Sequence, residues 1–505
     1  MGCQAIHAAT LRGVEATHVT VEVALSSGLP SITIVGMPST AVLESRNRIR
    51  CAIAQCGFEV PRMGVTVNLA PSDVKKAGTG LDLPMAIAIL AASGQIPTAG
   101  LDGCLFVGEL GLGGAVSEVR GAIAYALLAR DLGLSLAGAT RLVRGAGGAG
   151  ALREPLAIDN ISWLKRGVAS LSGAGAIGPE PSGAASAGLD FADVVDQETA
   201  KRALVIAACG GHGALMCGPP GSGKTMLAKR MPTILPSLSE AEMFEPMLVH
   251  SVCGLPIDDI RAGRRPFRAP HHSVTRAGLV GGGSPITPGE ASLAHRGVLF
   301  LDELPEFSPS VLQALRQPME DGEIRLVRAD GVCTFPSVFQ LIAAANPCPC
   351  GHAGDRGHVC RCTPAQIARY QSRVGGALMD RIDVFVDVAR PAAASVIKGG
   401  EGLSSQTMAH QVSVGRDFGS WRRARGSGGM PGSVESCDLS PKAQSLLELM
   451  AERLSLGGRA IARTARVART IADLAERERV DTDDVAEACA FRSRYALGDE
   501  SSGGA

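Results

Sequence analysis

The sequence predicts an α/β protein: a parallel-sheet core with a phosphate-binding loop (P-loop) and a helical C-terminal lid, preceded by an N-terminal α+β domain. Three observations predict this fold. A glycine-rich loop, 218–225, lies between a strand-like run and a helix-like run. Strand-like and helix-like runs alternate from Leu189 to about Arg390, which is typical of a parallel sheet. Helical periodicity then covers 441–454 and 459–477.

Composition divides the chain into four segments. Residues 1–166 form a separate α+β domain, and 167–188 are rich in Gly, Ala and Ser, as flexible linkers are. The predicted nucleotide-binding core covers 189–395, and 396–505 form the helical lid domain. With 505 residues and 46% apolar content, the chain has enough core material for several domains.

The charge and cysteine content exclude some classes of protein. The 49 basic and 49 acidic residues cancel, so nucleic-acid binding must come from local patches. We find no signal peptide, and no apolar run reaches the ~20 residues of a membrane span. The 14 cysteines of a chain of this size indicate a reducing compartment, and we expect a cytoplasmic protein without a membrane partner.

The loop Gly-Pro-Pro-Gly-Ser-Gly-Lys-Thr fits the P-loop pattern of Gly, four residues, and Gly-Lys-Thr. Its glycines let backbone N–H groups surround a triphosphate, and the following helix start attracts negative charge. Lys224 is expected to reach the β- and γ-phosphates of ATP, and the Thr225 hydroxyl to bind Mg²⁺. The predicted phosphate-binding residues are Gly218, Pro219, Pro220, Gly221, Ser222, Gly223, Lys224 and Thr225.

Polar residues follow two further apolar runs. After the strand-like Val298–Leu301, Asp302 is expected to bind Mg²⁺ and Glu303 to polarise the attacking water. A kinase would place an acceptor there instead, but the adjacent Asp-Glu pair favours hydrolysis. Asn346 follows the run 339–345; it either orients the water or contacts the γ-phosphate, or simply caps the strand.

The order of these elements, followed by Arg381 between two aspartates, resembles the AAA+ ATPases. Longer strings resemble one branch of that superfamily, the Mg-chelatase-like ATPases of the YifB/ComM family. The matching strings include Arg265–His272, Leu299–Phe307, Asn346–Gly351 and Val467–Leu474. The resemblance covers nearly the whole chain.

The local sequence does not decide the roles of several further residues, but the resemblance implies a role for each. Arg381 would be a finger that reaches the γ-phosphate of a neighbouring subunit, although alone it suggests an intrahelical salt bridge. Arg459, or one turn later Arg463, would contact the γ-phosphate of its own chain. Gln197 would lie near the adenine, with Asp196 replacing the glycine of the family pattern. A finger from a neighbour implies a ring, and we expect a homo-hexamer.

The N-terminal region resembles a Lon-protease-like domain. That comparison puts Gly80 where a protease has its serine and Ile123 where it has its lysine. Both catalytic groups are missing, so we expect binding or ring assembly instead of peptide hydrolysis.

Four cysteines lie in two close pairs, Cys348 with Cys350 and Cys360 with Cys362. Four thiolates can close a tetrahedral, structural Zn²⁺ site. The Cys-x-Cys spacing is less common than Cys-x-x-Cys, and the alternative is four reduced cysteines in a Pro/Gly-rich loop.

Two basic stretches are candidates for contact with DNA phosphates. One holds five arginines between 261 and 276 together with His271 and His272, a pair that we expect to be structural. The other, 323–334, alternates like a hairpin with a turn at 329–331. Related ring ATPases point such insertions into the pore, so Arg325 and Arg328 are candidates; alternatively, these arginines pair with acids.

The prediction is a hexameric AAA+ ATPase that moves along branched or single-stranded DNA. The resemblance implies branch migration of recombination intermediates during natural transformation. One alternative is a protein-remodelling motor for metal insertion, as in Mg-chelatase. Another is a non-catalytic DNA-binding scaffold, against which the intact Lys224, Asp302 and Glu303 argue.

Overall fold

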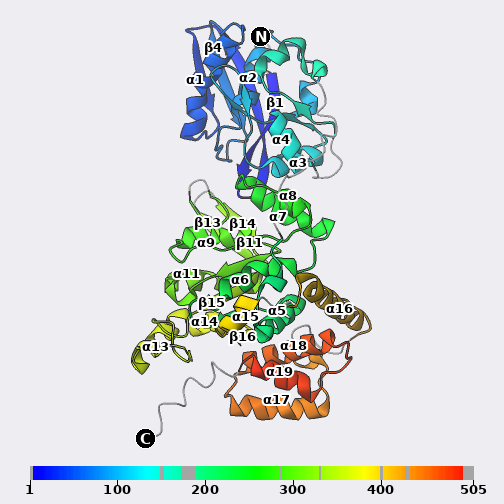
Figure 1. Cartoon of the computed structure of the whole chain (residues 1–505). Coiled ribbons are helices and arrows are strands. Elements are labelled where there is room, and N and C mark those ends of the chain that lie inside the picture. Colours follow the sequence, from blue (N-terminus) through cyan, green and yellow to red (C-terminus); the bar gives the residue numbers. More distant parts are fainter. Residues whose placement is uncertain are drawn as a thin grey trace.

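The computed structural model describes residues 4–147, 153–171, 188–283, 286–328, 331–355, 357–398, 402–426 and 433–492. An N-terminal domain, a central core and a C-terminal helical region follow one another along the molecule (Figure 1). Most of the predicted linker, 172–187, and the tail after 492 lie outside the described residues.

The N-terminal domain is a seven-stranded mixed sheet of order β3-β4-β2-β1-β5-β8-β9. Its second strand buries every other residue, Val19, Val21 and Val23, so one face of the sheet is packed. Almost every residue of helix α2 is buried. The elements are β1 (Gln4–Arg12), β2 (Glu15–Ser26), β3 (Ser31–Val35), α1 (Thr40–Gln55), β4 (Gly64–Ala70), α2 (Asp82–Ala92), β5 (Cys104–Phe106), β6 (Glu109–Leu110), β7 (Val116–Ser117), α3 (Ala122–Asp131), β8 (Ser135–Gly138), α4 (Thr140–Gly145) and β9 (Leu156–Ala157).

The core is a five-stranded parallel sheet of order β11-β12-β15-β10-β16. Its inner strands β12 and β15 are buried along their whole length and apolar except for Gln340, as expected of a parallel sheet covered on both faces. Parallel strands bring their carboxyl ends to one edge, where ligands bind in such sheets. The elements are α5 (Glu198–Gly210), β10 (Ala214–Cys217), α6 (Lys224–Arg230), α7 (Glu240–Val252), α8 (Asp258–Arg261), β11 (Phe267–Arg268), α9 (Arg276–Val280), α10 (Glu290–Leu293), β12 (Val298–Leu301), α11 (Pro309–Ala314), α12 (Arg316–Asp321), β13 (Glu323–Arg328), β14 (Gly331–Pro336), β15 (Gln340–Ala345), α13 (Pro364–Gln371), α14 (Gly376–Met379), β16 (Val384–Asp387) and α15 (Ala393–Lys398).

Helices alone make the C-terminal region: α16 (Ser405–Ala424), α17 (Pro441–Arg453), α18 (Gly458–Leu474) and α19 (Thr482–Ala490). Helix α16 was not predicted, because its sequence is polar and rich in Gly and Ser. Ser404 caps it by accepting a hydrogen bond from the Thr407 N–H, and Met408 and Val412 are buried one turn apart. The helix packs against α5 and α18, where Arg416 donates to the Ala208 carbonyl and Arg422 pairs with Asp473.

The N-terminal domain and the core share a hydrophobic cluster. Val14 and Ala124 of the first domain pack in the same cluster as Val249 of α7 and Phe335 of β14. Beside it, the Gly121 N–H donates to the Ser251 carbonyl over 2.9 Å. Figure 1 shows α3 against α7 at this contact.

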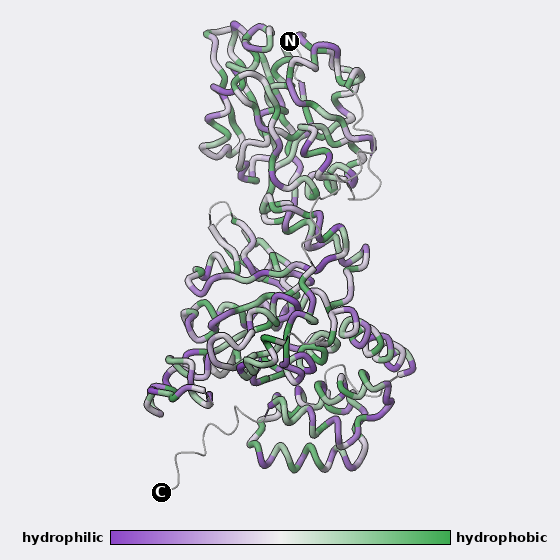
Figure 2. The backbone as a smooth tube through the Cα atoms, in the orientation of Figure 1, coloured by the Kyte–Doolittle hydropathy of each residue, from purple (hydrophilic) through white to green (hydrophobic). Residues whose placement is uncertain are grey.

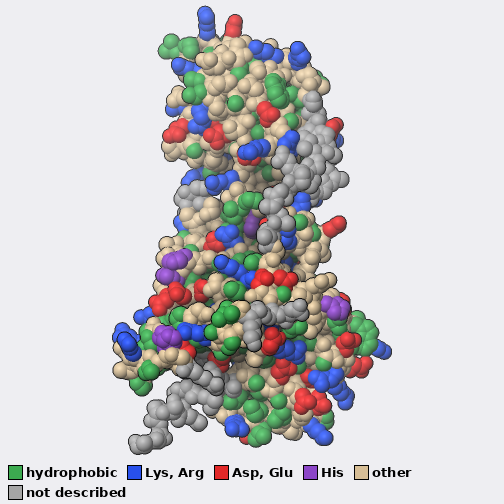
Figure 3. Space-filling view, in the orientation of Figure 1, with side chains coloured by type: hydrophobic (Ala, Val, Ile, Leu, Met, Phe, Trp, Pro, Cys, Tyr) green, Lys and Arg blue, Asp and Glu red, His purple; other side chains and the backbone are tan. Residues whose placement is uncertain are grey.

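The described part of the chain contains no helix that combines the length and apolar character needed to cross a membrane. Hydrophobic residues concentrate in the strands and on the inner sides of helices (Figure 2). On the face in Figure 3, basic and acidic side chains are interspersed, in keeping with a net charge of zero. The predicted fold class is confirmed: a mixed-sheet N-terminal domain, a parallel five-stranded core and a helical C-terminal region.

Replacing Gly297 by Ala should strongly destabilise the protein. An added Cβ would lie 2.0 Å from the Pro266 carbonyl oxygen, and a backbone oxygen between β11 and β12 cannot move freely. We expect a loss of about 3 kcal/mol in the free energy of unfolding, measured by urea denaturation. Gly458→Ala is the control, because a Cβ there meets nothing within 4 Å at the start of α18. Equal stability of the two variants would contradict the prediction.

Candidate functional site

The P-loop runs from the end of β10 into α6. Gly221 and Gly223 have φ angles of +76° and +94°, a region that glycine adopts without strain. Gly218 is needed for another reason, since a Cβ would lie 2.1 Å from the Val388 carbonyl oxygen beside β16. The backbone can therefore form a tight phosphate cradle only with these glycines.

The Lys224 ammonium lies inside this loop. It donates hydrogen bonds to the Gly218 carbonyl (2.7 Å), the Pro219 carbonyl (3.0 Å) and Asn346 Oδ1 (3.2 Å). The residue is 8% exposed, and burial lowers its pKa, while the charges of Asp302 and Glu303 oppose the shift. Lys224 begins α6 after the loop that follows β10, and Asn346 follows β15. The structure thus brings these two residues together.

The two predicted Mg²⁺ ligands also meet. Thr225 Oγ1 donates to Asp302 Oδ2 over 2.7 Å, and the Glu303 N–H donates to Asp302 Oδ1 over 3.0 Å. Glu303 has a φ of +51°, which turns the chain sharply at the end of β12. A hydroxyl and a carboxylate oxygen are ligands that suit Mg²⁺.

His272 is a neighbour of this site that the sequence analysis missed. Its Nδ1 lies 3.6 Å from Glu303 Oε2, while the analysis expected only a structural role for the pair His271 and His272. No local sequence pattern links these histidines to Glu303. Their place in the string Arg265–His272, which resembles the family, was the only feature that could have pointed to a role.

Gln197 and Asp196 lie beside the loop. Gln197 Nε2 donates to the Ser222 carbonyl (3.4 Å) and to the Ala389 carbonyl. Asp196 and Gln197 both have left-handed backbones, with φ of +59° and +69°. That conformation explains why the family pattern has a glycine at position 196. In this chain the Asp196 side chain accepts a hydrogen bond from the Ala392 N–H over 3.3 Å.

The arginines with predicted roles lie at the opposite edge of the sheet. Arg381 and Asp383 both precede β16, whereas the P-loop follows the parallel neighbour β10. Arg463 Nη1 lies 3.7 Å from Asp383 Oδ1, which fixes α18 at this amino edge. Burial lowers the pKa of Arg381, and the charges of Arg316, Arg463 and Arg459 add to the effect.

Arg459 lies near Arg381, since its charge contributes to the lowered pKa of Arg381. The lid is docked at this edge, because Arg463 and Arg466 of α18 each lie 3.7 Å from Asp383, whose side chain is only 11% exposed. The contact with the γ-phosphate of the same chain that was expected of Arg459 or Arg463 stays a prediction. Arg381 itself pairs with Glu320.

The four cysteines converge. Sγ–Sγ distances are 3.4 Å for Cys348–Cys350, 3.7 Å for Cys348–Cys360 and 3.6 Å for Cys350–Cys360, and Cys362 completes the group. A tetrahedral Zn²⁺ with ~2.3 Å bonds would separate its sulfurs by about 3.8 Å. Backbone N–H groups of Arg361 and His352 lower the pKa of Cys350 to about 6, whereas desolvation and the thiols of Cys348 and Cys350 raise the pKa of Cys360 and Cys362. The geometry and chemistry fit zinc.

The cysteine loop packs on the P-loop. Gly351 has a φ of +81°, and a Cβ there would lie 2.6 Å from Pro220 Cδ. Arg390, which follows β16 and contacts His358 of the cysteine loop, donates from Nη2 to the Pro220 carbonyl over 3.3 Å. Any distortion of the cysteine loop would therefore press on the phosphate cradle.

The predicted hairpin is formed by β13 and β14, although 329–330 of its turn lie outside the described residues. Arg325 is exposed and lies 3.1 Å from Glu323, and Arg328 is exposed near the tip. Most arginines of the 261–276 stretch have internal partners instead. Those partners are Gly147 O for Arg261, Asp259 for Arg264, Pro236 O and Arg296 O for Arg265, and Glu290 for Arg268.

Gly80 and Ile123 are both buried in the N-terminal domain. A Cβ on Gly80 would lie 3.3 Å from Val107 and 3.7 Å from Tyr125 and Val119, so this position is closely packed. The resemblance to Lon protease remains a prediction.

Three family profiles match the chain: "Subunit ChlI of Mg-chelatase" over 21–137, "Magnesium chelatase, subunit ChlI" over 190–396 and its C-terminal part over 402–492. The uncharacterized protein YifB of Escherichia coli is 41% identical, with 98% of this chain and 97% of that protein aligned. The competence protein ComM of Haemophilus influenzae is 40% identical over 98% and 99% of the two chains. The magnesium-chelatase 67 kDa subunit of Heliobacterium mobile is 29% identical over 34% and 29%.

Replacing Gly351 by Ala should weaken nucleotide binding by about tenfold, or ~1.4 kcal/mol, because the new Cβ pushes Pro220 out of the phosphate cradle. The dissociation constant of a fluorescent ADP analogue measures the effect. Gly354→Ala is the matched control: its φ of +76° imposes the same left-handed strain, but its Cβ meets nothing within 4 Å. Equal affinities of the two variants would refute the coupling.

Proposed function

The chain belongs to the YifB/ComM family of Mg-chelatase-like AAA+ ATPases, and we propose that it is a ring-forming motor that hydrolyses ATP to move along DNA. The observation that carries the proposal is an ATP site that is complete on one side only. The residues that would bind the phosphates and Mg²⁺ and activate water lie at one edge of the sheet. The arginines lie at the opposite edge.

Hydrolysis is supported by the groups at the carboxyl edge. Lys224 would stabilise the β- and γ-phosphates, and Thr225 with Asp302 would hold Mg²⁺. Glu303, exposed and next to Asp302, would polarise the attacking water, and His272 would orient that carboxylate. When bound, Mg²⁺ would neutralise charge on the phosphates.

A ring is supported by the position of Arg381. It lies just before β16 at the amino edge, with the charge of Arg459 nearby, whereas the P-loop follows β10 at the carboxyl edge. In a ring the same edge would face the nucleotide of a neighbouring subunit, and Arg381 would stabilise the charge that develops on its γ-phosphate. Both arginines would then act in trans, in a homo-hexamer.

DNA as the substrate is supported by the β13–β14 hairpin and by the similarity to a competence protein. Arg325 and Arg328 are exposed on the hairpin and would contact phosphates of branched or single-stranded DNA. Branch migration of recombination intermediates during natural transformation is the process that we propose for this motor.

Metal insertion, as in Mg-chelatase, is the rival proposal. The N-terminal domain does not argue against it, because the profile that matches 21–137 is itself described as subunit ChlI. The aligned length favours the DNA motor instead: ComM aligns over 98% of this chain, whereas the chelatase subunit aligns over 34%.

We also propose that Cys348, Cys350, Cys360 and Cys362 hold a structural Zn²⁺. Four thiolates leave no open coordination position, so the ion would stiffen the loop against Pro220 without taking part in hydrolysis.

ATP hydrolysis should rise several-fold on adding single-stranded or branched DNA at low salt, where phosphate contacts are strongest. Arg325→Ala combined with Arg328→Ala should remove this stimulation. The measurement is phosphate release at fixed ATP.

Two controls accompany it. Glu303→Gln should reduce phosphate release at least ~100-fold with or without DNA, which excludes a contaminating ATPase. Arg264→Ala removes an exposed arginine that pairs with Asp259, and it should keep the stimulation. If no DNA raises phosphate release by the wild type at low salt, the proposal of translocation on DNA is wrong. The result would then favour a protein-remodelling motor like that of Mg-chelatase.

Protein purified without added zinc should carry about one zinc per chain by mass-spectrometric metal analysis. Replacing Cys350 and Cys362 by Ala together should reduce that content to near zero, because two thiolates bind zinc far more weakly. Cys51→Ala removes an exposed cysteine of α1 in the N-terminal domain, and it should leave the zinc content unchanged. Less than half an equivalent in the wild type would refute a resident zinc.

A further inference from the structure

We propose that His352, Asp355 and His358 form a second metal site, separate from the four cysteines, that takes an exchangeable divalent ion of the zinc class. These residues lie in the loop between the two cysteine pairs, and neither the nucleotide site nor the cysteine cluster uses their side chains.

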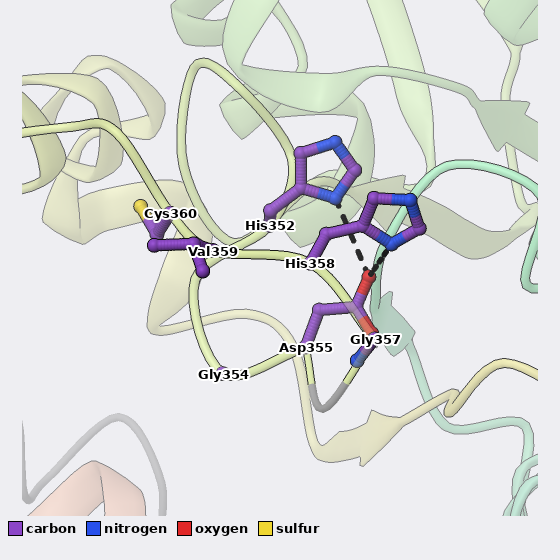
Figure 4. A pocket seen from close by; sticks show the side chains of 7 residues that line it. All are labelled: His352, Gly354, Asp355, Gly357, His358, Val359 and Cys360. Carbon is purple, nitrogen blue, oxygen red and sulfur yellow. Dashed lines mark hydrogen bonds and ion pairs between the residues drawn. The ribbon is translucent and has the colours of Figure 1, made fainter.

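The three donor groups already face one another. The Nδ1 atoms of His352 and His358 each lie 3.3 Å from the same oxygen, Oδ2 of Asp355. Their rings are stacked with centroids 4.8 Å apart at 23°. Figure 4 shows the two imidazoles side by side, with the Asp355 carboxylate joined to both. Each residue can offer a ligand atom within 4.8 Å of the others.

The carboxylate is held in place for this role. Its side chain is 7% exposed, and its other oxygen, Oδ1, accepts a hydrogen bond from the Gly357 N–H over 3.0 Å. The Asp355 N–H in turn donates to the His352 carbonyl, which closes the turn that brings the two residues together. Oδ2 therefore points at the imidazoles without a backbone donor of its own.

Arg390 lies beside two of the donor atoms. Its Nη1 is 3.2 Å from His358 Nδ1, and its Nη2 is 3.6 Å from Asp355 Oδ2. A metal ion would replace the guanidinium at these two atoms, and Arg390 would keep its hydrogen bond to the Pro220 carbonyl.

Space for the ion and for water is present. His352, Asp355 and His358 line a cavity of about 340 Å³, together with Gly354, Val359 and Cys360. Two imidazoles and one carboxylate leave at least one position of a tetrahedral ion open, so water would complete the shell. Imidazole and carboxylate ligands suit Zn²⁺, and three ligands on one loop predict weaker binding than four thiolates provide.

The test is a zinc titration of the full-length protein. After dialysis, the wild type should take up one further zinc per chain when zinc is added, measured by equilibrium dialysis and metal analysis. His352→Gln with His358→Gln should lose this second equivalent and keep the first. His410→Gln, which removes an exposed histidine of α16, should keep both.

Cobalt separates the two sites. Thiolate-to-cobalt charge-transfer bands should accompany the tightly bound equivalent, and the second should add only weak ligand-field bands. The single variant His358→Ala, checked by circular dichroism, guards against misfolding of the double variant. The proposal is overturned if the wild type takes no second equivalent, if the histidine variants retain it, or if the second equivalent shows thiolate bands.

Discussion

A buried lysine without a contacting carboxylate organises the nucleotide site. Lys224 is satisfied by two carbonyls of its own loop and by the amide oxygen of Asn346, which ends a neighbouring strand. Burying an ammonium is costly unless its protons are hydrogen-bonded, so these three acceptors keep the loop and the end of β15 in register. Thr225, the next residue, then meets Asp302.

The same sheet separates the catalytic groups from the arginines. Residues that follow parallel strands gather at one edge, and residues that precede them gather at the other. Asp383, at the second edge, is buried; burial alone would raise its pKa, but the hydrogen bond to His212 and the charges of Arg466 and Arg463 lower it instead. This carboxylate anchors the lid to the core. The position of the lid and the position of Arg381 are therefore linked within one subunit.

The carboxyl-edge site could be predicted because it depends on a local rule. Asp302 and Asn346 each follow an apolar run, and parallel strands must bring such residues together. The place of Arg459 depends on where the lid docks, which is decided by long-range pairs with Asp383. Likewise, α16 is held by packing that its polar composition does not reveal. His352 and His358 carry no spacing signal, since a turn around Asp355 brings them together.

One apolar cluster contains both Val14 and Phe335 and so joins two regions that the sequence separates by a linker. Gly13, at the turn between β1 and β2, lies beside the Phe335 ring, whose nearest atom would be 3.5 Å from an added Cβ. Because one apolar cluster spans both regions, cutting the chain at 167–188 would expose it on both fragments. The base of the hairpin is thus braced by residues of the first domain that lie more than 300 positions earlier in the sequence.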